Sequence, residues 1–197
     1  HVSLITGILF FILKKIKDNL KYFIVISFLV IYVFLTGLQA SVLRSVSFFI
    51  VNYLNKKYSF DLDIKNTFLV AIIVLLIIYP NLIIDIGFQY SSIISFSLIN
   101  FNYLIKGNYF KTCLTISIIA FLISLPITIN NNFEINILSI INNLFIVPYI
   151  SYILYPLSIL TFFIPILDNL LFIFCNLIEV ISSHLFVLNI IIPKMNI

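Results

Sequence analysis

The sequence predicts an all-α fold, a polytopic transmembrane helical bundle of about seven membrane segments, some of them short, broken or re-entrant. Three observations support this class. The 197 residues are 62% hydrophobic and 9% charged, with a mean hydropathy of +1.22, whereas a soluble domain has about 25% charged residues. The few charges recur at intervals close to the roughly 20 residues of one membrane crossing. Lysines gather in short loops that alternate with loops carrying single acidic residues.

Four uncharged intervals each have the length of one helical crossing. Charged residues bound them at positions 21–44, 65–85, 85–106 and 111–134. The first of these crossings should end near Gly37. The apolar run that begins at His1 is shorter, and we expect it to be a span whose beginning was removed. The sequence therefore predicts one transmembrane domain over residues 1–197, cut from a longer protein.

The interval from Glu134 to Asp168 is too long for one crossing. As one continuous helix it would measure about 50 Å, against a hydrocarbon core of about 30 Å. Pro148, Pro156 and Pro165 fall inside it. We therefore expect broken or kinked segments there.

The lysines predict the orientation, because basic loops remain on the cytoplasmic side. Basic loops lie at residues 14–21, 56–65 and 106–111, and the loops that follow the second and the third carry only Asp85 and Glu134, respectively. All three basic loops fall on one side if the segment Gln39–Asn55 also crosses or dips through the membrane. We expect that it does.

The segment Gln39–Asn55 has the most informative polar pattern. As a helix it places its polar side chains within one arc about 100° wide, opposite an apolar face. The polar arc consists of Ser41, Arg44, Ser45, Asn52 and Asn55. This face either lines a water-filled space or polar partner, or belongs to an interfacial helix whose arginine reaches lipid headgroups. The pattern alone leaves both interpretations open.

A second polar strip follows Pro80. If residues 85–100 are helical, one side carries Asp85, Gln89, Ser92 and Asn100. Gly87 weakens the case for an unbroken helix, and a re-entrant turn near residues 80–87 is the alternative. We favour the simpler interpretation that Asp85 caps the outer end of the next span.

The last apolar run carries a third polar face, made of Asn176, Glu179, Ser182 and Ser183, with His184 pointing elsewhere. Glu179 is a candidate for a proton relay or a cation site. We favour an inter-helix hydrogen bond to a neighbouring span.

The sequence contains no arrangement that predicts catalysis. Cys113 and Cys175 lie in apolar runs without metal-ligand spacing, and we expect buried thiols. Four glycines in the whole chain exclude a glycine-rich phosphate loop. The sequence therefore predicts no enzyme, no metal site and no cofactor.

Several short motifs follow one another in a characteristic order: HVSLITG, LTGLQASVLRSVSFF, DIKNTFLV, YPNLIIDIGFQYSS and INNLFIVP. This order resembles the competence domain of the ComEC family, the inner-membrane DNA channel of bacterial natural transformation. The matching positions are His1, Gly37, Ser41, Arg44, Asp63, Asn66, Pro80, Asp85, Gly87, Gln89, Ser91, Asn143 and Pro148. Ala40, Ser45 and Phe48 stand where the family usually has proline, alanine and methionine.

The resemblance implies a multi-pass domain of the bacterial plasma (inner) membrane that conducts single-stranded DNA during uptake. It implies as partners single-stranded DNA, the lipid bilayer, other proteins of the competence machinery and further copies in a homo-oligomer. The polar face with Arg44, Ser45 and Asn52 would supply a wet, positive wall for the strand. Members usually carry an OB-like domain before this region and often a metallo-β-lactamase-like domain after it. Neither is expected in this chain, so the resemblance assigns it no nuclease activity.

Two alternatives stay open from the sequence. One is a proton- or ion-coupled transporter of small solutes with Glu179 or Asp85 as the coupling carboxylate. It requires inverted repeats, and the two halves show no convincing internal symmetry. The other is a membrane enzyme or assembly scaffold, which the lack of a catalytic set disfavours.

Overall fold

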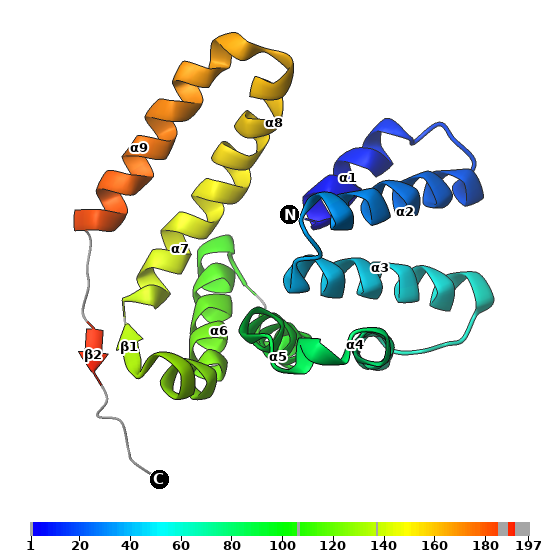
Figure 1. The fold of residues 1–197 in the computed structure, drawn as a ribbon, viewed down its shortest axis with the longest axis horizontal. Coiled ribbons are helices and arrows are strands. Elements are labelled where there is room, and N and C mark those ends of the chain that lie inside the picture. Colours follow the sequence, from blue (N-terminus) through cyan, green and yellow to red (C-terminus); the bar gives the residue numbers. More distant parts are fainter. Residues whose placement is uncertain (1, 106, 137, 185–188, 192–197) are drawn as a thin grey trace. The chain divides into compact units, whose positions relative to one another are not determined.

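The structure is a computed structural model that describes residues 2–105, 107–136, 138–184 and 189–191. The chain divides into two compact units, His1–Asn102 and Tyr103–Ile197. Helices make up nearly all of both units (Figure 1). The first unit contains α1 (Val2–Ile12), α2 (Asp18–Leu35), α3 (Ala40–Tyr58), a 3-10 turn (Pro80–Ile83) after α4 (Ile64–Ile78), and α5 (Ile86–Asn100).

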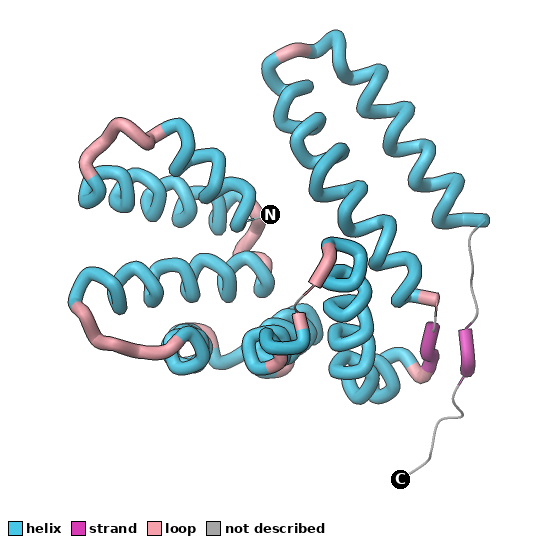
Figure 2. Tube along the Cα trace, turned by 180° about the vertical axis from the view of Figure 1, so that it is seen from behind, coloured by secondary structure: helices cyan, strands magenta, loops and turns pink. Residues whose placement is uncertain are grey.

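The second unit contains four α-helices and a small two-stranded ribbon. The helices are α6 (Tyr109–Asn132), α7 (Ser139–Tyr149), α8 (Tyr155–Phe163) and α9 (Asp168–His184). The strands β1 (Glu134–Asn136) and β2 (Asn189–Ile191) pair antiparallel, with Ile135 opposite Ile190 (Figure 2). No sequence pattern predicts this ribbon, because strands of three residues are too short to show an alternation of apolar and polar residues.

The helices confirm the predicted all-α membrane class. Three helical stretches are long and apolar enough to cross a membrane: Asp18–Leu35, Tyr109–Asn132 and Asn143–Thr161. Two shorter apolar helices, α1 and α4, accompany them. Large apolar side chains remain exposed along these helices, as expected for surfaces that face lipid. The total number of membrane segments stays a prediction.

Helix α3 is the central element of the first unit. It contacts α1, α2, α4 and α5, and its apolar face carries the buried residues Val42, Leu43 and Val46. These pack in one cluster with Val25 and Leu29 of α2, which are fully buried. A helix with this amphipathic pattern is stabilised by burying its apolar face.

The end of α2 confirms the expectation that the first complete crossing stops near Gly37. Gly37 has a positive φ of 67°. Its N–H bonds the Phe34 carbonyl at 3.1 Å, and the Leu38 N–H bonds the Val33 carbonyl at 3.0 Å. These two bonds are those of a Schellman motif, which terminates a helix at a left-handed residue. The turn frees α3 to start as a separate helix.

The interval between Glu134 and Asp168 is less interrupted than its prolines predict. Helix α7 runs through Pro148 into a π-helical turn at Ile150–Leu154, which leads directly into α8. A proline removes one donor from the helical ladder, and the wider π pairing directly after it keeps the chain helical. Pro156 lies in the first turn of α8, directly after the π turn, and does not interrupt the helical stretch. The expected break occurs before Pro165, where Ile164 leaves the helical conformation.

Candidate functional site

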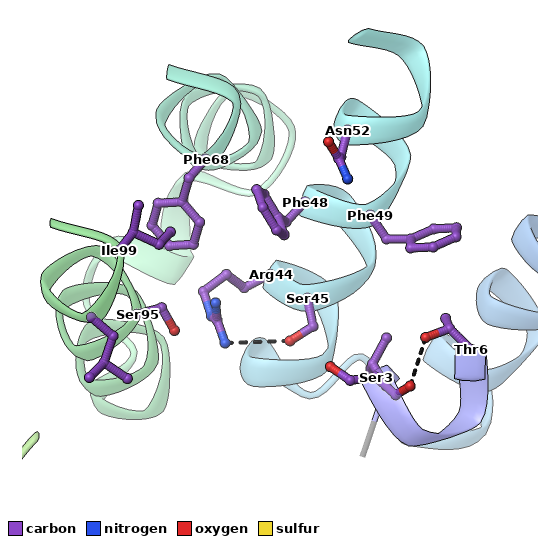
Figure 3. A pocket seen from close by; sticks show the side chains of 12 residues that line it. Ser3, Thr6, Arg44, Ser45, Phe48, Phe49, Asn52, Phe68, Ser95 and Ile99 are labelled. Carbon is purple, nitrogen blue, oxygen red and sulfur yellow. Dashed lines mark hydrogen bonds between the residues drawn. The ribbon is translucent and has the colours of Figure 1, made fainter. Parts of the chain in front are cut away.

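The polar face of α3 lines a cavity of about 420 Å³ inside the first unit. Four helices contribute side chains to it, namely α1, α3, α4 and α5 (Figure 3). The lining residues are Val2, Ser3, Thr6, Arg44, Ser45, Phe48, Phe49, Asn52, Phe68, Ser95, Leu98 and Ile99. At the volume of liquid water, such a space holds on the order of ten water molecules. Of the two interpretations of α3, the structure therefore agrees with the face that lines a space large enough for water.

Arg44 extends from α3 toward α5 and is the charged residue of this lining (Figure 3). Its Nη2 donates to Ser45 Oγ at 3.4 Å, and its Cζ lies 5.8 Å from the centre of the Phe68 ring. Its Nε is buried and has no hydrogen-bond partner. Among the described residues, no carboxylate forms an ion pair with Arg44. A guanidinium in this position is available to an anion that enters the cavity.

The neutral polar groups of the cavity differ in how they are used. Ser45 Oγ donates to the Ser41 carbonyl at 2.9 Å, so its lone pair is what meets Arg44. Thr6 Oγ1 donates to the Ser3 carbonyl at 2.9 Å. Within the described part of the chain, the side chains of Asn52 and Ser95 form no hydrogen bond. These two side chains retain their hydrogen-bonding capacity for water or a ligand.

Two predicted members of the α3 face lie outside the cavity lining. Ser41 is half-buried in the first turn of α3. Asn55 instead binds the loop after α3. Its Nδ2 donates to the Leu62 carbonyl at 2.9 Å, and its Oδ1 accepts from the Leu62 N–H at 3.1 Å. The amide of Asn55 therefore has a structural role.

The motif around Asp85 forms the start of α5. Asp85 Oδ1 accepts from the Phe88 N–H at 2.6 Å, which is the geometry of a helix N-cap. A Cβ at Gly87 would lie 3.2 Å from this oxygen. Gln89 Nε2 donates to the Ile83 carbonyl at 2.8 Å. The favoured capping interpretation thus agrees with the structure, and α5 is unbroken from Ile86 onward.

The remaining predicted residues lie at other places. Pro80 opens the 3-10 turn after α4, and Asp63 is exposed directly before α4 without a side-chain cap bond. Asn143 and Pro148 line a second cavity, of about 460 Å³, in the second unit. Within the first unit, the structure thus brings Arg44, Ser45 and Asn52 together in one cavity lining, which does not include Asp63, Pro80, Asp85, Gly87 or Gln89.

The third predicted polar face lies on α9. Asn176 and Glu179 lie exposed on α9, and the side chains of Ser182, Ser183 and His184 lie outside the described part.

Of the two cysteines, Cys113 is half-buried beside the second cavity. Cys175 is exposed, so the expectation of a buried thiol is wrong at that position. An apolar neighbourhood in the sequence marks contact with lipid as readily as burial in protein.

Sequence reasoning missed the side chains of the Arg44 cavity that come from other helices, and four of them bear on the chemistry of the site. They are Ser3, Thr6, Phe68 and Ser95. Ser3, Thr6 and Phe68 stand in apolar helices without a polar periodicity of their own, and Ser95 lies on α5 but outside its predicted polar strip, so no local pattern marks them. The signal that exists is weak: small hydroxyl residues recur on helices that must approach α3 closely.

The comparison with known proteins decides the family. The competence protein family model matches residues 1–193. The chain belongs to the competence protein family. It is 31% identical over 165 residues to ComE operon protein 3 of Bacillus subtilis (strain 168). That alignment covers 79% of this chain and 21% of the relative, so the chain spans about a fifth of the relative's length.

The competence protein family confirms the resemblance drawn from the motifs. No solved structure matches the chain, so the geometry of the Arg44 cavity comes from this structure. The family does not favour an ion-coupled transporter. Asp85, one of the two carboxylates that such a transporter could use, caps α5.

Proposed function

We propose that this chain forms part of a conduit that carries single-stranded DNA across the bacterial plasma membrane during natural transformation. Membership of the competence protein family supports a role in DNA uptake. The observation that carries the conduit is the Arg44 cavity, a space within the first unit that is lined by polar and apolar side chains and bears a cation. The role we propose is conduction, without catalysis.

A DNA strand needs such a space because every phosphate carries a charge that hydrocarbon cannot accommodate. A polar wall with one guanidinium replaces part of the hydration that the strand loses. A cation held away from bulk water is itself costly; the insertion cost reaches about 2.5–3.5 kcal/mol at the centre of a membrane helix and is smaller at Arg44, which lies near the start of α3. A passing anion would offset this cost, which gives a physical reason for placing Arg44 there.

The sparse charge of the cavity suits movement. Arg44 is the cationic group among the residues that line it, so the lining holds a phosphate by one charge. Conduction requires binding that is favourable enough for entry and weak enough for release. Several converging arginines would hold the strand in place. One arginine with neutral neighbours permits stepwise passage.

The cavity has the size of one station along the path and is smaller than a complete pore. It has space for on the order of ten waters, less than a strand of several nucleotides needs. The chain spans about a fifth of the length of its relative. We therefore propose that further parts of the full-length protein, other copies of it in a homo-oligomer, or other competence proteins complete the conduit.

The test replaces Arg44 in the full-length protein. Arg44→Ala should lower transformation frequency about 10- to 100-fold, because a hydrogen bond to a charged group contributes about 1.5–3 kcal/mol. Arg44→Glu should lower it further, and Arg44→Lys should fall between, because lysine keeps the charge without the planar fork. Transformation frequency is measured together with the amount of protein in the membrane.

Lys56→Ala is the matched control. It removes one positive charge from the same helix at an exposed position outside the cavity, so transformation should stay close to wild type. Normal transformation by Arg44→Ala at normal protein level would reject the conduit wall.

A further inference from the structure

The chemistry of the Arg44 cavity narrows the class of ligand it takes. Arg44 is the one charged residue among the lining residues. The nearest carboxylate on α5, Asp85, is bonded to the Phe88 N–H at the far start of that helix. The lining therefore has a formal charge of +1 and no acidic group. The Nε atom of Arg44 is buried without a hydrogen-bond partner, whereas buried polar atoms normally have one.

The fold holds Arg44 by groups that do not neutralise it. The guanidinium Cζ lies 5.8 Å from the centre of the Phe68 ring, a cation–π distance. Phe68 is itself fixed, since it is 1% exposed and packs edge-on against Phe48 with ring centres 5.6 Å apart. Ser45 Oγ accepts a hydrogen bond from the guanidinium. A carboxylate in the place of Phe68 or of Ser45 would form a bidentate ion pair with the guanidinium and compete with any ligand.

We infer that the Arg44 cavity is a binding site for a single phosphodiester monoanion, with Phe68 and Ser45 as positioning residues that hold the guanidinium in place of a carboxylate. One positive charge matches the single negative charge of a phosphodiester. The side chains of Asn52 and Ser95 add neutral hydrogen bonds to its oxygens. The volume of about 420 Å³ accommodates one such group with residual water.

A phosphodiester reaches this cavity from one of two sources. One is the backbone of a DNA strand, and this source rests on the proposed function. The other is the headgroup of a membrane phospholipid, which carries the same group and surrounds the helices. The shared chemistry is the site we infer, and the experiment separates the two sources.

The first arm measures DNA binding to the full-length protein in detergent micelles without added phospholipid, so that no added headgroup competes for the site. The probe is a fluorescent oligothymidylate, titrated at several salt concentrations by fluorescence anisotropy. Arg44→Ala should reduce the slope of log affinity against log salt by about 0.7, the value for one phosphate contact on a single strand. A strand with neutral methylphosphonate linkages should bind the wild type and Arg44→Ala equally. Arg44→Gln, which keeps more of the side-chain volume, repeats the test if Arg44→Ala does not fold.

The second arm measures lipid. Phosphatidylglycerol that co-purifies with the full-length protein is quantified by mass spectrometry for the wild type and Arg44→Ala. A change in the salt slope with unchanged lipid assigns the site to the strand. Loss of about one bound lipid with an unchanged salt slope assigns it to the headgroup. No change in either arm overturns the inference.

A third variant tests the exclusion of carboxylates. Asn52→Asp places an acid of nearly the same size in the cavity, where it should pair with Arg44 and reproduce the effect of Arg44→Ala. Asn19→Asp makes the same change at an exposed position of α2 and should behave as wild type. If Asn52→Asp also behaves as wild type, in both arms, the cavity is not the ligand site.

Transformation, measured in parallel, separates this inference from the proposed function. If Arg44→Ala abolishes transformation but changes neither arm, the phosphodiester site fails and the conduit stands. If it changes a binding arm but leaves transformation intact, the site stands and the conduit fails.

Discussion

The two units of the chain bury their side chains differently. In the first unit an apolar cluster surrounds α3, with Val25 and Leu29 fully buried. In the described part of the second unit, Ser117 is the one buried residue. An apolar helix in lipid gains little from being covered by protein, since lipid tails are as apolar as leucine. A helix that carries an arginine and two asparagines does need protein around it, and in the first unit α3 has four helices around it.

The two cavities differ in the same sense. The cavity of the first unit carries Arg44. The cavity of the second unit, between α6 and the α7 stretch, is lined by neutral groups that include Asn143 and Tyr152. The first unit thus contains both the buried apolar cluster around α3 and the charged cavity residue, Arg44. The difference indicates that the ordered core serves to hold a cation at a defined place, which the following predictions test.

The largest expected effect is on stability, and it separates the two units. Leu29→Ala should lower the free energy of unfolding by about 2–4 kcal/mol, because it leaves a cavity in a packed cluster. Leu122→Ala, on the 56% exposed side chain of α6, should lower it by less than about 0.5 kcal/mol. Thermal unfolding of the full-length protein in nanodiscs measures both. Equal losses would show that the second unit has a core of its own.

The second effect is on the access of water. In a protein whose cysteines are replaced by serine, Ser95→Cys should react with a charged methanethiosulfonate reagent at least about tenfold faster than Ile93→Cys. The reactive species is the thiolate, which forms in water and not in lipid. Both positions lie on α5, but Ser95 lines the cavity and Ile93 is exposed outside it. Equal rates would mean that the cavity is dry.

A third, smaller effect on stability compares a side chain that bonds the loop after its helix with a side chain that bonds a carbonyl of its own helix. Asn55→Ala should cost about 1–2 kcal/mol, since it leaves both backbone groups of Leu62 without their partner. Asn100→Ala should cost less than about 0.5 kcal/mol, because its amide bonds the Phe96 carbonyl of its own helix. Thermal unfolding again provides the measurement. A cost at Asn100 as large as at Asn55 would contradict this distinction.

The sequence predicted those residues of the cavity lining that share one face of one helix, α3. The period of α3 correctly grouped Arg44, Ser45 and Asn52, because residues on one helical face share a neighbour whatever that neighbour is. Asn55 shares the polar arc of α3 but not the cavity, since the loop after α3 returns to that position. Ser95 was not predictable, because which helices approach α3 depends on packing between distant segments.

The same limit applies to the fold. Charge-free intervals predicted the helix ends at Gly37 and Asp85, where a local signal exists in glycine or a capping acid. They did not predict the π turn after Pro148 or the pairing of β1 with β2, which rests on residues more than fifty positions apart. The polar strip after Pro80 was real as a pattern, but Asp85 and Asn100 are satisfied by nearby backbone groups.

The smallest expected effect depends on its background and tests the start of α5. In the wild type, Gly87→Ala places a Cβ 3.2 Å from the capping oxygen of Asp85, which should weaken a cap that contributes about 1 kcal/mol. Alanine also favours the helix by about 0.5–1 kcal/mol over glycine, so the net change should be close to zero. In an Asp85→Ala background the cap is already lost, and the same change should stabilise by about 0.5–1 kcal/mol. Thermal unfolding of the four proteins gives a coupling free energy near 1 kcal/mol. A coupling of zero would mean that Gly87 is not there to leave room for the cap, and that the motif at this end of the first unit needs another explanation.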